Sequence, residues 1–532
     1  MNPFFPHAIV HAEESMKICA VCFLLTVFLA PCALFAQASY DPNDALYRYL
    51  DVWEGRGVLE SLPRLRPYSA EVLRELLRNV VERGTTDDAR VAKEFLGEVS
   101  GVALHAHASQ RSEARDVTYF GRSGVGAHML VQMFPQASVG GRVDFWFVDG
   151  KPEAVQPIGE RTDFELDEDP STAYAHVLGR DLLLRLSSAF SLSVGDRTLS
   201  LQAGLNRSSF GPFFDNGLVV GPQAPVAGTL TLNWDLDAVR IYYGLFELTQ
   251  RIPPKGGLLQ TGKYLALHGV EVLPLPWLTL DAFEMVVWSG RFEPLYLIPV
   301  SDFFYTQSLN GFTDNSLLGV AGTARISTGI EFKGMLIADD SHKFAGQAGI
   351  VWAPASEVLR NVALDYTVVT PYTYTHKPNE INQSIDYTNW DVNEGPALEP
   401  NSDRIEARAF LTPLPSLELT AQGRFIRHGN ASEDYIGAGD AQDHSGTISD
   451  PGYVGTEPIF AQKLWNALSF LTERTIDMSL QVGLGAAWRL RAGWGSLRLS
   501  ARYLFELRLN EGLASGTTGA HNFISLGAEY SY

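Results

Sequence analysis

The sequence predicts an all-β membrane protein, a transmembrane antiparallel β-barrel of about 18 strands with a small N-terminal α-helical periplasmic module. Three observations predict it: an export-type N-terminus, a long region of alternating apolar and polar residues, and a last strand that ends on an aromatic residue. Residues 521–532 show the alternation most clearly, with small or polar residues between Ile524, Leu526, Ala528, Tyr530 and Tyr532. A period of two places one set on each face of a strand. Such a strand at the end of an exported chain is typical of outer-membrane barrels.

Residues 1–38 are predicted to be an upstream extension plus a cleaved signal peptide. Met16-Lys17 open a short positive region, and residues 18–30 are an apolar stretch too short to cross a bilayer as a helix. Residues 36–38, Ala-Gln-Ala, offer a cleavage site. A lipoprotein alternative rests on residues 29–32, Leu-Ala-Pro-Cys, whose proline departs from the usual lipobox. Because all 3 cysteines lie in this segment, the mature chain has no disulfide, thiolate metal site or cysteine nucleophile.

The composition narrows the class further. Hydrophobic residues make up 45% of the chain, yet no run of about 18 apolar residues follows the signal. Strands that alternate in polarity conceal apolar content in this way. The formal net charge of −20 argues against nucleic acid as a partner, because nucleic-acid binding requires a basic surface.

Residues 39–110 are predicted to form the helical periplasmic module. A first helix over residues 41–53 carries its apolar side chains at helical spacing. Ser69 is expected to cap a second helix that ends at Gly84, and Thr86 a third. Since short amphipathic helices must bury their apolar stripes, we expect them to pack against the periplasmic rim of the barrel.

Residues 111–532 are predicted to form the barrel. Charges repeat at every second position along residues 404–411, 417–425 and 497–508, which suits a wet lumen better than a packed core. Eight short turns, such as those at 274–276 and 413–416, alternate with nine other connections; the first of these is expected at 122–125. The others include the connections at 150–181, 206–227, 248–262, 289–315, 371–402 and 428–478. Short turns belong on the periplasmic side, so both termini are expected there.

Four stretches, taken in order, resemble the Wzi family of outer-membrane capsule-assembly proteins. Residues 211–225 are similar to that family's W/F-G-P-G…L-x-L-S-x-N-A-P pattern, residues 314–319 to D-N-x-L-x-G, residues 400–403 to G-P-D-A-D, and residues 55–67 to L-x-x-x-G-x-I…W-P-L. The tryptophan and the second glycine of the first pattern are missing, and Gly221 stands where serine is usual. The resemblance implies a periplasmic helical segment, an 18-stranded barrel and the holding of exported polysaccharide at the cell surface.

Two sets of residues are candidates for binding. Aromatic, acidic, amide and guanidinium groups suit sugar contact, and the glycan-binding candidates are Asp215, Asn216, Trp288, Arg291, Asp314, Asn315, Asn401 and Asp403. The alternatives are an interfacial aromatic girdle for the aromatic residues and a plain surface loop for 206–227, which could also fold into the lumen. Inward arginines form a lumen basic stripe, either for an anionic solute or polymer or within a salt-bridge lattice: Arg404, Arg408, Arg424, Arg489, Arg498, Arg502 and Arg508.

The sequence shows no catalytic constellation and implies no cofactor. The 12 histidines place some histidine near a serine by chance, and no nucleophile-elbow pattern occurs. His105 and His107 could share one strand face, but two histidines alone rarely bind a metal, so no metal site is predicted.

The leading function is therefore non-enzymatic binding or anchoring of exported surface polysaccharide at the cell outer membrane. The alternatives are a porin-like diffusion channel, which requires an open lumen, and an adhesin acting through loops 371–402 and 428–478. The expected partners are outer-membrane lipid, surface polysaccharide and, through the C-terminal strand 521–532, the barrel-assembly machinery.

Overall fold

The computed structural model describes residues 41–99, 102–150, 155–161, 172–177, 180–213, 216–249, 262–339, 343–371, 373–374, 385–390, 392–429, 475–493 and 495–532. The predicted export signal lies outside these residues. Within them, no helix combines the length and the apolar character needed to span a bilayer.

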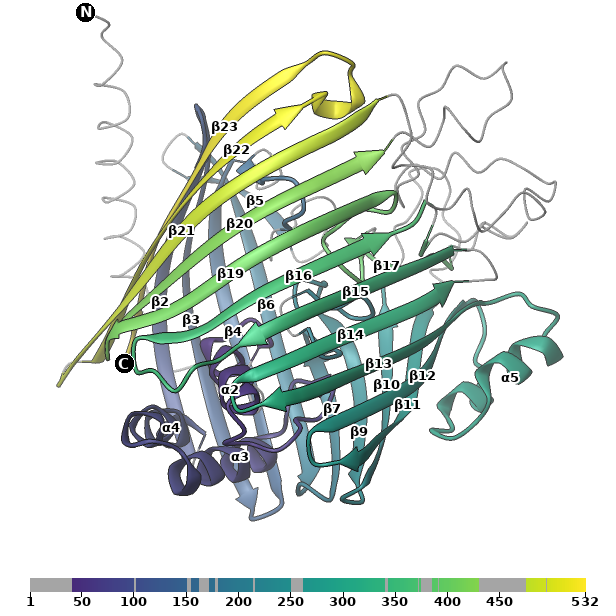
Figure 1. Cartoon of the computed structure of the whole chain (residues 1–532). Helices are drawn as coiled ribbons and strands as arrows, with labels where there is room; N and C mark the ends of the chain where they lie inside the picture. The colour runs from purple at the N-terminus through teal and green to yellow at the C-terminus, as the bar shows by residue number, and fades with distance from the viewer. Residues whose placement is uncertain are drawn as a thin grey trace, which may run out of the picture.

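Eighteen antiparallel strands close into a barrel, as the sequence predicts (Figure 1). They are β2 (Val102–Arg115), β3 (Thr118–Phe134), β4 (Ala137–Asp149), β6 (Arg180–Gly195), β7 (Leu199–Asn206), β9 (Ala227–Asp235), β10 (Val239–Leu248), β11 (Lys263–Leu275), β12 (Leu278–Ser289), β13 (Asn315–Ser327), β14 (Ile330–Asp339), β15 (Lys343–Trp352), β16 (Leu359–Val369), β19 (Ser402–Leu414), β20 (Leu417–Gly429), β21 (Ile476–Ala492), β22 (Gly495–Leu509) and β23 (Thr518–Ser531). Pairing of β2 with β23 closes the ring.

The remaining elements are short strands and helices. The strands are β1 (Leu65–Arg66), β5 (Thr172–Val177), β8 (Ser209–Phe210), β17 (Thr388–Asn389) and β18 (Val392–Asn393). The helices are α2 (Ala45–Gly55), α3 (Ala70–Arg83), α4 (Thr86–Glu98), α5 (Phe303–Leu309), and the 3-10 turns η2 (Pro294–Leu297) and η5 (Glu511–Leu513).

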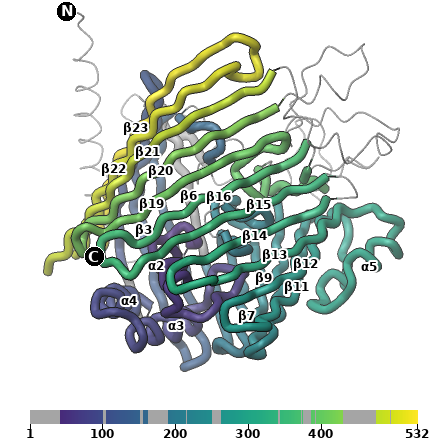
Figure 2. The backbone as a smooth tube through the Cα atoms, in the orientation of Figure 1, coloured from purple at the N-terminus to yellow at the C-terminus, as the bar shows by residue number. Residues whose placement is uncertain are grey.

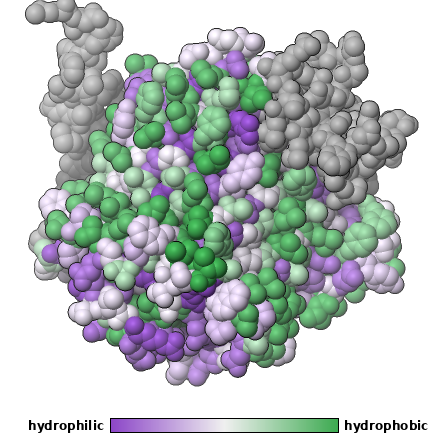
Figure 3. Space-filling view, in the orientation of Figure 1, coloured by the Kyte–Doolittle hydropathy of each residue, from purple (hydrophilic) through white to green (hydrophobic). Residues whose placement is uncertain are grey.

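The alternation of the strands separates a lipid-facing wall from a polar lumen. On β21, Leu480, Val482 and Leu484 are at least half exposed, whereas Ser479 and Gln481 are fully buried inside. Hydrophobic side chains accordingly spread over the strands in Figure 3, and hydrophilic ones gather at the bottom of that view. Exposed tryptophans mark the short-turn end: Trp234, Trp277, Trp352 and Trp488. Such a girdle is typical of a membrane interface.

The three N-terminal helices gather at the short-turn end of the barrel (Figure 2). Ser69 caps α3 by accepting a hydrogen bond from the amide of Val72, as predicted. The cap of α4 is Thr85, and the prediction of Thr86 is wrong by one residue. Thr85 forms a reciprocal capping box with Asp88, which satisfies two backbone donors at the start of that helix.

Three further expectations differ from the structure. The barrel begins at Val102 instead of residue 111, and its first turn lies between Arg115 and Thr118 instead of at 122–125. β2 carries alanine and histidine at many positions, so its alternation is weak in the sequence. The third difference concerns α2. Whereas α3 and α4 lie at the rim, α2 enters the barrel. The contacts of its buried residues with side chains from several strands show this position.

Candidate functional site inside the barrel

The lumen of the barrel is occupied by segments that enter from both ends. From the short-turn end come α2 and residues 56–68, and from the other end come residues 207–226, 155–161 and 385–401. Hydrogen bonds connect these segments to one another as well as to the wall. Of the two predictions for loop 206–227, folding into the lumen is thus confirmed.

A two-stranded sheet joins the two directions of entry. β1 pairs with β8 inside the lumen, and the amide of Gly211 donates to the carbonyl of Arg64 at 3.0 Å. The ring of Phe210 is fully buried between Tyr242 and Phe283 of the wall, with ring centroids 5.2 and 5.0 Å away. The two Wzi-like stretches at 55–67 and 211–225 therefore meet in space.

The segment 385–401 holds loop 207–226 in place. The amide of Gly221 donates to the carbonyl of Glu394 at 2.7 Å. Outside this segment, the hydroxyl of Tyr374 also holds the loop by donating to the carbonyl of Leu218 at 2.7 Å. The side chain of Glu394 is buried as well, and this burial raises its pKa to about 7. Its partial protonation near neutral pH lowers the cost of burying a carboxyl group.

Glu160 lies between two arginines of the basic stripe. It forms ion pairs with Arg424 and Arg502, and one Arg502 nitrogen donates to it at 2.7 Å. Burial alone would raise the pKa of the Glu160 carboxyl, but the two guanidinium groups outweigh burial and hold the pKa well below its usual range. The next residue, Arg161, donates to the carbonyls of Asn393 and Pro396 at 2.5 and 2.7 Å. Residues 155–161 therefore connect the wall with the segment 385–401.

Most of the basic stripe forms ion pairs, as the salt-bridge alternative expects. Arg404 and Arg424 both contact Glu406, at 3.4 and 2.7 Å. Further pairs join Arg408 to Asp365, Arg498 to Glu418, and Arg508 to both Asp477 and Glu511. Arg489 lines a pocket together with Glu418 and Arg498.

A charged cavity of about 310 Å³ remains between α2, loop 207–226 and the strands β14, β15, β16, β19, β20 and β22. Its lining carries six basic side chains and three carboxylates: Arg48, Lys333, Arg404, Arg408, Arg424 and Arg502, with Asp51, Asp365 and Glu406. Asn216, Gln223 and Gln422 add amides, and Phe213 and Phe410 add aromatic faces. The volume lies at the lower end of the range of about 300–1,000 Å³ for small-molecule sites.

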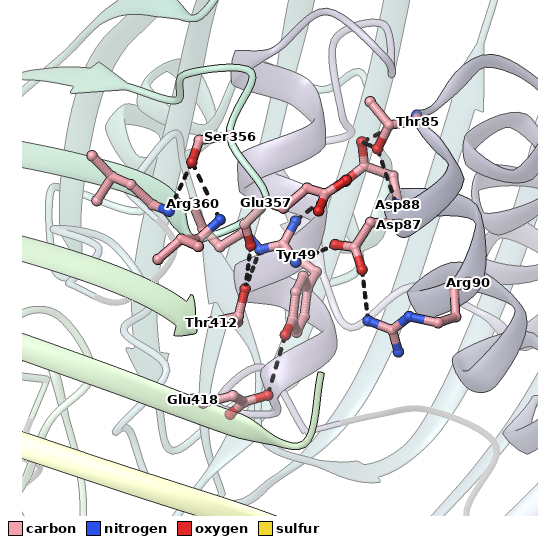
Figure 4. A network of polar contacts seen from close by, with 12 residues as sticks. Tyr49, Thr85, Asp87, Asp88, Arg90, Ser356, Glu357, Arg360, Thr412 and Glu418 are labelled. Atoms are coloured by element: carbon pink, nitrogen blue, oxygen red, sulfur yellow. Dashed lines mark hydrogen bonds and ion pairs between the residues drawn. The ribbon is translucent and has the colours of Figure 1, made fainter. Parts of the chain in front are cut away.

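Two polar networks attach the N-terminal helices to the wall. Inside the lumen, Asp51 of α2 pairs with Lys333 of β14. At the rim, Asp88 accepts hydrogen bonds from Trp53 at 3.0 Å and Arg56 at 3.1 Å. Asp88 also lies 3.7 Å from Arg360 of β16 (Figure 4). These pairs could not be predicted from the sequence, because each partner comes from a distant element.

The glycan-binding candidates do not form one site. Asp215 lies outside the described residues, and Asn216 is buried in the lumen, 3.5 Å from the hydroxyl of Thr367. Asn401 adopts a left-handed conformation and donates to the carbonyl of Gly429 at 2.7 Å. Asp403 is buried and pairs with Arg427 at 2.5 Å. Asn401 and Asp403 thus support the end of the connection that leads into β19.

Trp288, Arg291 and Asp314 do come together, but on the outside of the wall. Arg291 pairs with Asp314 at 2.5 Å, and the Tyr296 hydroxyl donates to Asp314 at 2.7 Å. Trp288 packs against Tyr296 at 4.9 Å. Asn315 is fully buried at the start of β13.

His107 is buried in the lumen, where its Nε2 lies 2.5 Å from an Asp144 oxygen, and the ring of His105 lies near that of His128. Among the described residues, no three histidine or acidic side chains are grouped as metal ligands.

The fold and the filled lumen define a transmembrane β-barrel of the outer-membrane class. No protein family matches the sequence, and no curated protein matches it either. Among solved structures, it is similar to Wzi of Escherichia coli, described as a carbohydrate-binding β-barrel involved in group 1 capsule assembly. The match has 12% identity and a TM-score of 0.58, and covers 94% of this chain and 99% of that one. OprD of Pseudomonas aeruginosa matches with 10% identity, a TM-score of 0.42 and coverage of 81% and 96%.

Proposed function

We propose that this protein is a non-enzymatic outer-membrane barrel that binds carbohydrate at the cell surface and keeps its lumen filled. The observation that supports this proposal is the joining of the lumen segments from both ends, above all the pairing of β1 with β8. A diffusion channel has to keep a water-filled path, whereas a surface anchor has no such requirement. The likeness to a carbohydrate-binding barrel supports the choice of ligand class.

The charged cavity is where a sugar would find the most complementary groups. Arginine and amide donors surround it, and Phe213 and Phe410 supply apolar faces. Sugars combine hydrogen-bonding hydroxyls with apolar ring faces, so both kinds of group are useful. The basic excess of the lining favours a sugar that carries a carboxylate or phosphate.

Single-channel recording of the refolded protein in a planar bilayer is the first test. We expect no steady conductance from the wild type, and steady conductance from a variant whose residues 212–224 are replaced by a Gly-Ser linker. Conductance of this variant would show that the recording detects barrels that have inserted into the bilayer. Steady conductance of the wild type would contradict the proposal and make solute diffusion the function.

A glycan array then tests the ligand class with the same folded protein. Gln422→Trp fills the cavity, and Leu484→Trp places the same ring on the lipid-facing wall as a matched control. We expect both the wild type and Leu484→Trp to bind acidic glycans, and Gln422→Trp to lose them. If the wild type binds no glycan, the carbohydrate proposal fails.

A porin-like channel is the second candidate, and the observation that favours it is the charged cavity itself. A small ion or solute could use it if loop 207–226 moved. That candidate predicts conductance that opens and closes in the wild type, whereas the anchor predicts silence.

A further inference from the structure

The connection between β12 and β13, residues 290–314, folds back onto the outside of the barrel wall. We call it the flap. Its elements η2 and α5 lie beside the wall at the right of Figure 1, and Tyr296 and Phe303 from them are buried. They cover outward-facing side chains of β10, β11 and β12, namely Tyr243, Ala266, Val286 and Trp288.

The flap also covers a polar pair on the lipid-facing side of the wall. His268 of β11 and Glu284 of β12 are direct cross-strand neighbours, 3.4 Å apart. His268 donates from Nδ1 to the carbonyl of Pro299 at 3.0 Å, and its ring stacks on Phe303 at 4.0 Å. The Phe303 amide donates to Glu284 at 2.8 Å. Because bare lipid satisfies none of these groups, the flap supplies their partners.

Below this pair, a groove of about 630 Å³ runs between the wall and residues 299–302 of the flap. We call it the outer-wall groove. Its floor is a row of outward-facing apolar side chains across five strands: Ile241, Val270, Ala282, Val320 and Leu336. Ala282 is the smallest of them and makes the wall recede at its centre. His268, Glu284, Ser301 and Asp302 form one polar end.

The strand geometry places this groove within the membrane. Val270 lies seven residues along β11 and its turn from Trp277 of the interfacial girdle. At about 3.3 Å per residue and a tilt of about 40°, the height between them is roughly 18 Å, inside an apolar band of about 25 Å. The polar end of the groove, two residues higher, falls near the outer boundary of that band.

The outer surface of the flap is apolar too. Phe292 and Val300 are 77% and 76% exposed, and more than half of Phe304, Tyr305, Leu309 and Phe312 is exposed. The exposed surface of the flap is therefore apolar, like the lipid-facing surface of the barrel beside it.

We propose that the outer-wall groove binds an acyl chain of a membrane lipid, with the lipid's polar end beside His268 and Ser301. The groove is continuous with the lipid-facing band, lies at acyl-chain depth and changes from apolar to polar where a lipid does. Because the surrounding lipid is as apolar as the groove, selectivity comes from packing into the recess over Ala282 and from the polar end. The groove is independent of what the lumen binds.

The test uses a phosphatidylethanolamine that carries a diazirine at the end of one acyl chain. The full-length protein is reconstituted with this lipid, transferred into excess maltoside to remove loosely bound lipid, irradiated and mapped by peptide mass spectrometry. We expect cross-links on the strands β11–β13 and on residues 299–302. Ala282→Trp should lower this labelling about tenfold by filling the recess. Ala501→Trp, on exposed β22, should leave it unchanged.

Retained compact migration on unheated gels shows that each variant has folded. Equal labelling of β11–β13 and β20–β22 in the wild type would indicate surface lipid alone and overturn the proposal. Labelling that is insensitive to Ala282→Trp, or absent from β11–β13 in the wild type, would also overturn it.

Discussion

Removing the ring of Phe210 should open the lumen without unfolding the barrel. Phe210 is fully buried on loop 207–226 and packs against Tyr242 and Phe283 of the wall. Truncating such a phenylalanine to alanine costs about 3–5 kcal/mol. Because the wall is held by its own strand pairing, most of this loss falls on the docking of the loop. At about 1.4 kcal/mol for each factor of ten, the undocked population of the loop should rise by roughly three orders of magnitude.

The assay is single-channel recording in planar bilayers. Phe210→Ala should show brief openings that the wild type lacks, and its thermal unfolding should remain close to that of the wild type. Phe332→Ala, which removes a half-exposed ring from the lipid-facing wall, is the matched control and should stay silent. A folded Phe210→Ala variant that is as silent as the wild type would refute the inference that loop 207–226 closes the lumen through Phe210.

Three further predictions concern stability and use denaturant unfolding of the folded protein. Glu394→Gln should stabilise the protein at pH 8 by on the order of 3 kcal/mol and have little effect at pH 4. The folded state binds the extra proton between the unfolded pKa near 4.5 and the folded pKa of about 7, so wild-type stability falls as pH rises through that window. Glu160→Gln should destabilise the protein at neutral pH, and the difference from the wild type should shrink only below about pH 4.5, because the pKa of this carboxyl is depressed in the folded state. Asp88→Asn should cost about 3–5 kcal/mol of helix docking at the rim and expose α4 to protease, whereas Glu82→Gln should change neither.

The result that would contradict each of these is specific. A pH-independent gain in Glu394→Gln would mean that Glu394 is ionised when buried. A Glu160→Gln variant as stable as the wild type at pH 7 would mean that Arg424 and Arg502 do not depend on this carboxylate. Unchanged proteolysis in Asp88→Asn would show that the helices are held by apolar packing alone.

The alternating strands were predictable because polarity contrast is strong there. Along residues 402–429 and 476–509, arginines and glutamates alternate with apolar residues such as leucine. Each strand can be recognised from this alternation, and the number of strands can then be counted. The start of β2 is hard to predict from the sequence, because its alanines and histidines differ little in polarity. The boundary between helices and barrel therefore differs by nine residues.

The packing of segments inside the lumen and the position of the flap could not be predicted from local sequence pattern. The apolar stripe of α2 specifies that it is buried, but not in which surface. Only two residues of β1 pair with two residues of β8, and more than a hundred residues of sequence separate the two strands. The aromatic stretch from Trp288 to Asp314 is compatible in sequence with glycan contact or with an interfacial girdle, and the structure places it on the outer wall of the barrel.

The pairing of β1 with β8 also has a mechanical consequence. The loop that carries β8 comes from the long-loop end of the barrel, and the segment that carries β1 continues directly into α3 at the short-turn end. Any outward displacement of the loop has to break this pairing or pull residues 64–66 with it. A force applied to this loop is thus carried through the barrel, along backbone hydrogen bonds, to the helices at the opposite end.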